Sequence, residues 1–182
     1  MTAVATPAEI LLFWREAGQQ RWFEKDDDFD HTITSRFLPT HEAASRGELA
    51  GWESEAESAL ALLILLDQFP RNMFRGSARA FATDPSARAL ADRALAHGFD
   101  RMTEHELRQF FYLPFMHSEL LADQDRSLQL YDLYDDTNAL QYANTHRDII
   151  LKFGRFPHRN EVLGRSSTPA EEEFLKSGGF AG

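Results

Sequence analysis

Apolar residues recur along most of the chain at three- and four-residue spacings, the pattern of one face of an α-helix. Together with helix-start and helix-stop residues, this pattern predicts helices at 6–18, 28–48, 54–68, 85–97, 103–121, 123–135, 137–153 and 168–177. No segment shows the strict alternation of apolar and polar residues that is typical of a half-buried strand, and Val is scarce. The sequence therefore predicts an all-α fold of about eight helices stacked in antiparallel pairs.

Two of the predicted helices begin with the same four-residue signal. Thr-Pro-Ala-Glu occurs at 6–9 and again at 168–171. It places Thr as the N-cap, Pro at the first helical position, and Glu where its side chain reaches back to the cap. Two other prolines, Pro39 and Pro114, fall inside predicted helices, and each is expected to kink or split its helix.

Length, charge and composition narrow the class of protein. The 182 residues predict one domain over 1–182, with frayed ends at 1–5 and 178–182. A formal net charge of −10 argues against general nucleic-acid binding, which usually needs a basic face, but it leaves room for a local basic pocket. The absence of cysteine excludes disulfides, thiol catalysis and cysteine-ligated metal sites.

Neither a membrane span nor a secretory leader is predicted. The longest apolar run, at 59–66, is too short to cross a bilayer. The first residues lack the positively charged start and long apolar stretch of a signal peptide. We therefore expect a cytoplasmic protein without a membrane partner.

Three ionisable residues stand where the helical spacing calls for apolar ones. Asp67, His117 and His146 each continue the apolar stripe of their own predicted helix. Because burying even a neutral polar group without a partner costs on the order of 2–7 kcal/mol, these side chains are expected to have partners. Pro114 is expected to open its helix next to His117 and Glu119, which would form one wall of a pocket.

A basic segment interrupts the acidic chain at 153–165, "FGRFPHRNEVLGR", and a similar Phe-Pro-Arg-Asn word occurs at 69–72. Phe153 and Phe156 are expected to anchor this segment in the core, so that its polar side chains line a cleft facing 67–72 and 117–119. The complete set of candidate binding residues is Asp67, Arg71, Asn72, His117, Glu119, His146, Arg155, His158, Arg159, Asn160 and Arg165.

The same residues also have a structural interpretation. Asp67 and Arg71 stand at i and i+4 and would form an ion pair at a helix end. The three arginines between 155 and 165 would bond helix carbonyls or carboxylates and hold the C-terminal segment in place. Buried histidines are often satisfied core residues. Arginine donors that are used up inside the protein would favour such a clamp, whereas donors that point into an open pocket would favour a ligand site.

Two partial motifs fail as metal sites. The acidic run at 26–30 begins like a calcium loop, but its sixth position is His31 and its twelfth is Phe37 instead of Gly and Glu. We interpret it as a polar loop and helix N-cap. The segment at 105–109 has Gln109 where a zinc-protease helix has its second histidine. We expect no metal and no cofactor, because no ligand spacing supports a non-standard metal site. The residues considered for such a site are His117, Glu119, His146 and His158.

Longer sequence words carry a family resemblance. "LLDQFPRNMFRG", "FFYLPFMHSE" and "HRDIILKFGRFPHRNEVLGRSSTPAEEEFL", with the opening "ILLFWREAG", together resemble the bacterial "domain of unknown function 924" family from about Ile10 to about Phe180. The resemblance implies an all-α fold akin to tetratricopeptide-repeat (TPR)-like helical arrays, and it implies no established activity. The positions that match the family's words are Asp67, Gln68, Pro70, Arg71, Asn72, His117, Ser118, Glu119, His146, Arg147, Arg155, Pro157, His158, Arg159, Asn160 and Arg165.

Two functions follow as hypotheses. In the first, the Arg/His/Asp cleft binds a small anionic ligand or an acidic peptide end. A catalytic version would use His117 or His158 as general acid–base and Glu119 or Asp67 as the orienting carboxylate, but no nucleophile is evident and enzymatic activity is left open. The alternative is a TPR-like protein-interaction scaffold in which the cluster is a structural clamp. A third hypothesis is a homo-oligomer whose interface contains these polar residues.

Overall fold

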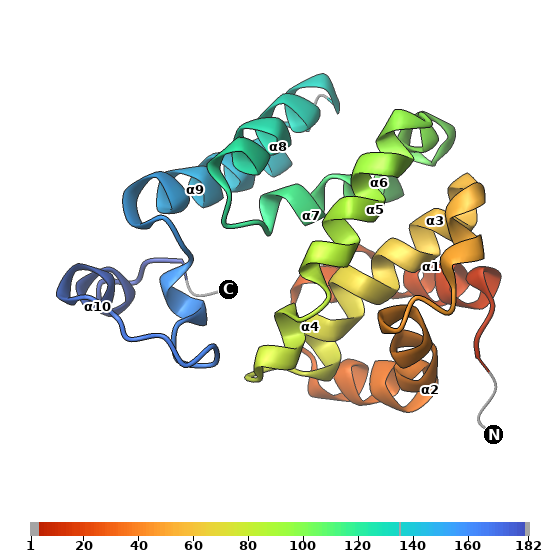
Figure 1. Ribbon diagram of the computed structural model, residues 1–182, viewed down its shortest axis with the longest axis horizontal. Coiled ribbons are helices and arrows are strands. Elements are labelled where there is room, and N and C mark those ends of the chain that lie inside the picture. The colour runs from red at the N-terminus through yellow and green to blue at the C-terminus, as the bar shows by residue number, and fades with distance from the viewer. Residues whose placement is uncertain (1–3, 135, 181–182) are drawn as a thin grey trace. The chain divides into compact units, whose positions relative to one another are not determined.

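The computed structural model describes residues 4–134 and 136–180, and these form helices and turns without a strand (Figure 1). The all-α prediction is therefore confirmed. The chain divides into two compact units, one made of residues 1–75 and 79–114 and the other of 76–78 and 115–182. We call them the N-terminal and C-terminal units. The expectations of a single domain and of a TPR-like stack stay predictions. None of the described helices has the length and apolar character needed to cross a membrane.

The N-terminal unit is built from α1 to α6 and from short irregular turns between them. Helix α1 packs against α3, and α2 packs against α4. A π-helix, Ile64–Gln68, joins α3 directly to α4, and 3₁₀ turns lie at Ala50–Ser54, Ala78–Phe81, Phe99–Met102 and Gln109–Phe111. The helices are α1 (Pro7–Phe23), α2 (Asp27–Ser45), α3 (Ala56–Leu63), α4 (Phe69–Met73), α5 (Asp84–Ala96) and α6 (His105–Arg108).

Aromatic residues fill the core of this unit. Trp14 is fully buried and stacks on Trp22, with ring centroids 5.8 Å apart. Phe110 meets the Trp22 ring edge-on at 5.1 Å, and Phe69 stacks on Phe37 at 5.0 Å. Rings from four separate elements, namely α1, α2, α4 and the 3₁₀ turn at Gln109–Phe111, thus share one apolar interior.

The C-terminal unit contains α8 (Leu121–Tyr134) and α9 (Thr137–Phe153), which lie side by side, followed by α10 (Pro169–Lys176). The short helix α7 (Leu113–Met116) carries the boundary between the two units. A 3₁₀ turn, Pro157–Arg159, lies in the segment between α9 and α10 and packs on α10. This basic segment is therefore a structured turn.

The predicted helix N-caps are confirmed near both ends of the chain. Thr6 caps α1 and Thr168 caps α10, each in a reciprocal box with the Glu three residues on. Asp26 caps α2 through its side chain, which confirms the N-cap predicted for the acidic run. Residues 1–3 and 181–182, part of the ends expected to fray, lie outside the described residues.

The two helices that were predicted to be kinked or split by a proline behave differently. Helix α2 is not split at Pro39, because buried residues on both sides of the proline, such as Phe37 and His41, hold the helix in the core; a kink at Pro39 stays a prediction. The helix expected at 103–121 is divided into α6, a 3₁₀ turn and α7, and helical structure stops at Met116 until α8 begins at Leu121. The break beside His117 that Pro114 predicted is therefore present.

Candidate functional site

The first candidate region is the π-helix of the N-terminal unit. There the Phe69 N–H bonds to the Ile64 oxygen, five residues back, so the Leu65 oxygen is left without its usual donor. Pro70 has no N–H, so the Leu66 oxygen also loses its usual partner. Wide turns of this kind expose backbone oxygens inside a helix and are frequent at functional sites.

The side chains of His41 and Thr83 bond to these two oxygens, and Arg71 bonds to the next one along the chain, that of Asp67. Because a carbonyl only accepts, His41 must carry its proton on Nδ1, and burial lowers the pKa of His41 below its ordinary value. The three contacts are His41 Nδ1 to the Leu65 oxygen at 2.8 Å, Thr83 Oγ1 to the Leu66 oxygen at 2.6 Å, and Arg71 Nη1 to the Asp67 oxygen at 2.6 Å.

Asp67 is 1% exposed, which confirms the prediction that its stripe points it inward. Its carboxylate accepts from the Gln68 amide and lies 3.4 Å from the Arg71 guanidinium. Arg71 also donates to both oxygens of Asp84, at 2.9 and 3.0 Å. Burial would lower the pKa of Arg71, but the charges of Asp67 and Asp84 outweigh it and raise the pKa.

Asn72 belongs to a neighbouring contact. Its amide donates to Asp30 Oδ1 at 2.7 Å, and Arg75 donates to both oxygens of the same carboxylate. The predicted residues of this unit therefore join α2, α4 and α5 through carboxylates of their own chain.

In the C-terminal unit, Arg155 is paired with Glu171, the residue that completes the cap of α10. Arg155 donates through Nε and Nη2 to the two carboxylate oxygens at 2.6 and 2.8 Å, and through Nη2 to the Ser166 oxygen at 2.8 Å. Glu171 is 2% exposed and also accepts from the Thr168 N–H. The bond from Arg155, followed by those from Thr168, lowers the pKa of Glu171 to about 2.

Arg165 connects three parts of this unit. Nη1 and Nη2 donate to Glu119 at 2.7 and 3.0 Å, Nη2 also donates to the Phe156 oxygen at 3.1 Å, and Nε donates to Asn160 Oδ1 at 3.0 Å. Glu119 in turn accepts from the Phe156 N–H at 2.8 Å. Burial would raise the pKa of Glu119, but the bonds from Arg165 and Phe156 outweigh it, so the pKa lies below its ordinary value.

The remaining predicted residues of the unit gather around aromatic rings. The Arg159 guanidinium lies 4.5 Å from the centroid of Phe156, which is fully buried. The His146 ring is buried and meets Phe156 at 5.5 Å and Phe180 at 4.5 Å. The His158 ring lies 5.3 Å from Phe180. These three side chains are therefore part of an aromatic cluster, and the predicted burial of His146 is confirmed.

The predicted residues thus fall into two sets, one in each unit. Asp67, Arg71 and Asn72 belong to the N-terminal unit, and His117 lies in the break after α7. The expectation that both sets face one cleft stays a prediction. The predicted residues within the C-terminal unit are His117, Glu119, His146, Arg155, His158, Arg159, Asn160 and Arg165.

Over residues 4–134 and 136–180, no group of three His, Asp or Glu side chains is arranged to hold a metal ion.

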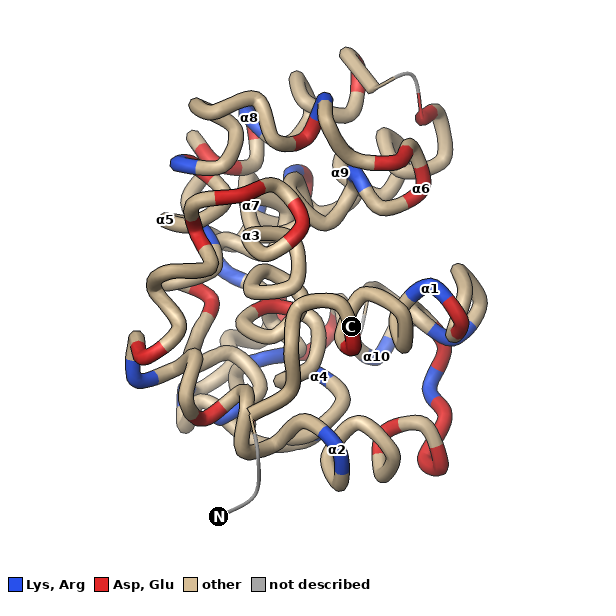
Figure 2. Tube along the Cα trace, turned by 90° about the vertical axis from the view of Figure 1, so that its right-hand side faces the viewer, with Lys and Arg blue, Asp and Glu red and all other residues tan. Residues whose placement is uncertain are grey.

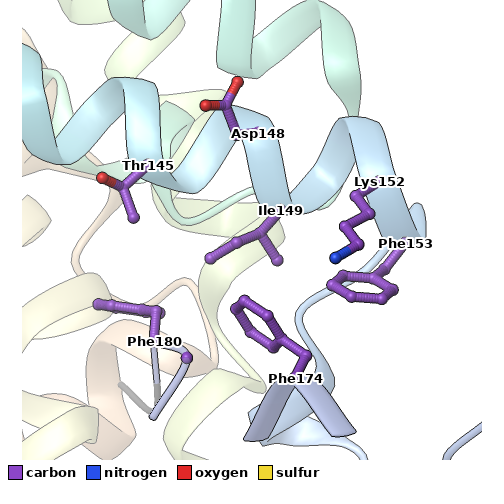
Figure 3. Close-up of a pocket in the computed structure, with 8 residues that line it drawn as sticks. Thr145, Asp148, Ile149, Lys152, Phe153, Phe174 and Phe180 are labelled. Carbon is purple, nitrogen blue, oxygen red and sulfur yellow. The ribbon is translucent and has the colours of Figure 1, made fainter. Parts of the chain in front are cut away.

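A pocket that the sequence did not predict lies between α9 and the C-terminal residues (Figure 3). Its volume is about 350 Å³, within the range of small ligand sites, and most of its wall is apolar. We call it the α9–α10 pocket. Its lining residues are Thr145, Asp148, Ile149, Lys152, Phe153, Phe174, Gly179 and Phe180.

The apolar wall of this pocket continues into the core. Phe153, Phe174 and Phe180 are partly buried and pack on the cluster formed by Ile149, Ile150 and Phe156, and the rings of Phe153 and Phe174 are 5.1 Å apart. Phe156 therefore anchors the segment as predicted, whereas Phe153 is only partly buried and lines the pocket.

Lys152 lies at the mouth of the pocket. Its ammonium is 4.9 Å from the centroid of Phe153 and 5.8 Å from that of Phe174, and Figure 3 shows it pointing toward these rings. The Asp148 carboxylate, one helical turn earlier, points in another direction. Neither residue was predicted from the sequence, because the apolar stripe that passes through His146 and Ile150 lies on the adjacent side of the helix. The adjacent stripe, at 145, 148–149 and 152–153, has the same spacing and was the available signal.

A second hollow, of about 410 Å³, lies in the N-terminal unit between α2, α3 and α5. Its two guanidiniums are already paired, Arg46 with Glu48 and Arg93 with Glu53, each through two bonds. Lys and Arg are interspersed with Asp and Glu along the chain in Figure 2. Paired cations of this kind do not form a basic patch for a polyanion.

Comparisons with known proteins agree with the sequence words. A family model described as "Bacterial protein of unknown function (DUF924)" matches residues 10–179. The solved structure of ATU0120 from Agrobacterium tumefaciens, a protein of unknown function, is similar to this chain with a TM-score of 0.91 and 50% sequence identity, over 94% of this chain and 97% of that one. A comparison with curated proteins found no match. The chain therefore belongs to the bacterial DUF924 family, as its sequence words predicted.

Proposed function

We propose that this protein is an interaction module whose C-terminal unit binds a hydrophobic segment of a partner protein in the α9–α10 pocket. The observation that carries the proposal is that the charged and the apolar side chains of that unit have different surroundings. Arg155 and Arg165 direct their donors to acceptors of their own chain, whereas the pocket presents Phe153 and Phe174 to solvent.

The arginine contacts also account for the shape of the pocket. The Arg155 pair fixes Glu171 at the first turn of α10, and the same helix carries Phe174, which forms the pocket wall. Arg165 holds the 156–165 segment to Glu119. The basic cluster is then a clamp that positions an apolar surface, which is the structural alternative drawn from the sequence.

Binding of an anion by these arginines is less well supported. Arg155 and Arg165 are each bonded to both oxygens of a carboxylate, the geometry that Arg also uses for anionic ligands. An incoming anion would have to displace Glu171 or Glu119, and would leave a carboxylate without its partner. This exchange offers little net gain in free energy.

The test is selection of short peptides from a displayed random library on the purified protein, followed by affinity measurements in solution. We expect a family of apolar peptides with micromolar affinity, a common range for open grooves with few anchor contacts. Thr145→Trp, which fills the exposed edge of the pocket, should weaken binding more than tenfold, because it blocks the wall without removing a core residue.

The matched control is Leu133→Ala. Leu133 is an apolar side chain of the same unit, 85% exposed on α8 and outside the pocket, so its removal should leave affinity unchanged. The proposal fails if no peptide binds the folded protein, or if Thr145→Trp and the parent protein bind the selected peptides equally well.

A further inference from the structure

The cations of the C-terminal unit are not all alike. Most have a carboxylate partner within 4 Å, whereas Lys152 has ring contacts and, over the described part of the chain, no carboxylate partner. The paired cations are Arg147 with Asp125, Arg155 with Glu171, Arg165 with Glu119, and Lys176 with Glu172.

Among the residues that the structure describes, Lys152 forms no ion pair although a carboxylate lies one helical turn away. Asp148 and Lys152 are at i and i+4 on α9, a spacing at which opposite charges usually attract. Lys152 instead extends over Phe153 and Phe174, at the opening of the pocket. A cation in this place keeps its charge available to whatever enters the pocket.

The chain itself indicates what the apolar part of the pocket accepts. Phe180, at the opposite end of the wall, packs its ring on His146 at 4.5 Å. It is brought there by Gly178, which has a φ of +81°, and by Gly179, at which a Cβ would lie 2.6 Å from the Phe174 oxygen. This surface therefore already packs one phenyl ring between aromatic neighbours.

The pocket has one positive and one negative side chain at its rim, Lys152 and Asp148, so a charged ligand should bind in one orientation. A ligand carboxylate near Lys152 would be attracted, and one near Asp148 would be repelled. We propose, on the basis of the function proposed above, that the pocket binds a peptide segment in which a large apolar side chain is next to Asp or Glu. The apolar side chain packs on Phe153 and Phe174, and the carboxylate pairs with Lys152.

The test uses three short blocked peptides that share a Phe-Leu centre and differ only in the next residue, which is Glu, Gln or Lys. Fluorescence anisotropy should show that the parent protein binds the Glu peptide about two- to fivefold more tightly than the Gln peptide, the range expected for an exposed ion pair. The preference should shrink as salt is raised. Lys152→Gln should abolish it, and Lys152→Glu should reverse it in favour of the Lys peptide.

Two variants serve as matched controls. Lys176→Gln removes a lysine of the same unit that lies outside the pocket and is paired with Glu172, so the preference for the Glu peptide should persist. Asp148→Asn should preserve or increase that preference, because it removes the repelling charge. Circular dichroism and thermal melting of each variant should match the parent protein, since both lysines are exposed.

The outcomes separate this inference from the function on which it rests. Equal binding of all three peptides overturns the carboxylate preference but keeps the interaction module. Retention of the preference in Lys152→Gln overturns the role of Lys152. Binding of free 4-phenylbutyrate as tightly as the Glu peptide overturns the peptide as ligand in favour of a small aromatic acid. Failure of every peptide from the library removes the proposed function itself.

Discussion

The guanidinium of Arg155 lies against the carboxylate of Glu171, so that one ion pair links the start of the segment after α9 to the first turn of α10. Glu171 is almost fully buried and makes two contacts: it accepts from Arg155, and it completes the capping box with Thr168. The C-terminal helix is thus held by charge at its beginning and by Phe174 in its middle.

Removal of Arg155 should destabilise the protein. Arg155→Ala leaves the buried Glu171 carboxylate with only its contacts from Thr168 and Asn160. We expect the melting temperature to fall by several degrees, and Arg155→Lys to recover only part of the loss because Lys lacks the planar fork. Arg46→Ala, at an exposed pair with Glu48, is the control and should change the melting temperature little. An unchanged melting temperature in Arg155→Ala would contradict the clamp.

Acid should weaken the contribution of Glu171. Its pKa is about 2 in the folded protein, below the value of about 4.3 for an unperturbed Glu. The unfolded state therefore binds more protons as the pH falls below that value, and the stabilisation present at neutral pH is lost on the way to the folded pKa. Urea unfolding of the parent protein and Glu171→Gln should show a stability difference that is constant above about pH 5 and shrinks below about pH 4. A difference that grows with acidity would contradict the assignment.

Thr83 should matter because Pro70 cannot replace its hydrogen bond. Thr83→Val keeps the shape of the side chain but leaves the buried Leu66 oxygen without a donor. We expect a loss of about 1–3 kcal/mol in the free energy of unfolding, measured by chemical denaturation. Thr32→Val is the matched control, since Thr32 bonds to a carbonyl of its own helix on an exposed surface. Equal effects of the two substitutions would show that the π-helix does not depend on this contact.

Gly179 should tolerate no side chain. An added Cβ would lie 2.6 Å from the backbone oxygen of Phe174, and a backbone atom cannot move aside as a flexible side chain can. Gly179→Ala should therefore cost about 1–3 kcal/mol, or displace Phe180 from His146 in NMR spectra. Gly51→Ala is the control, since no atom lies within 4 Å of its added Cβ and its φ is not in the left-handed region.

Features that depend on residues close together in the sequence could be predicted, and features that depend on residues far apart could not. The caps at Thr6 and Thr168 depend on residues three positions apart, and they were predicted correctly. The inward direction of Asp67 follows from the period of its helix, although the change of that helix into a π-helix does not. That change depends on His41 and Thr83, which are distant in sequence and supply donors only after folding.

The α9–α10 pocket was missed for a related reason. Lys152 and Asp148 are ordinary surface residues in the sequence, and only the approach of Phe174 from α10 makes their stripe the rim of a pocket. The basic segment was recognised, but its partners Glu119 and Glu171 could not be assigned because 37 residues separate Phe156 from Glu119 and 16 separate Arg155 from Glu171.

Helix α10 has eight residues, fewer than an isolated helix needs to be stable in water. Its structure therefore depends on contacts with Arg155 and the aromatic cluster, which are made only when the preceding segment is already folded. During folding, α10 should form after α9 and the 155–165 turn. A protease that cuts the chain between 165 and 168 should release this helix as an unfolded fragment and leave α8 and α9 paired.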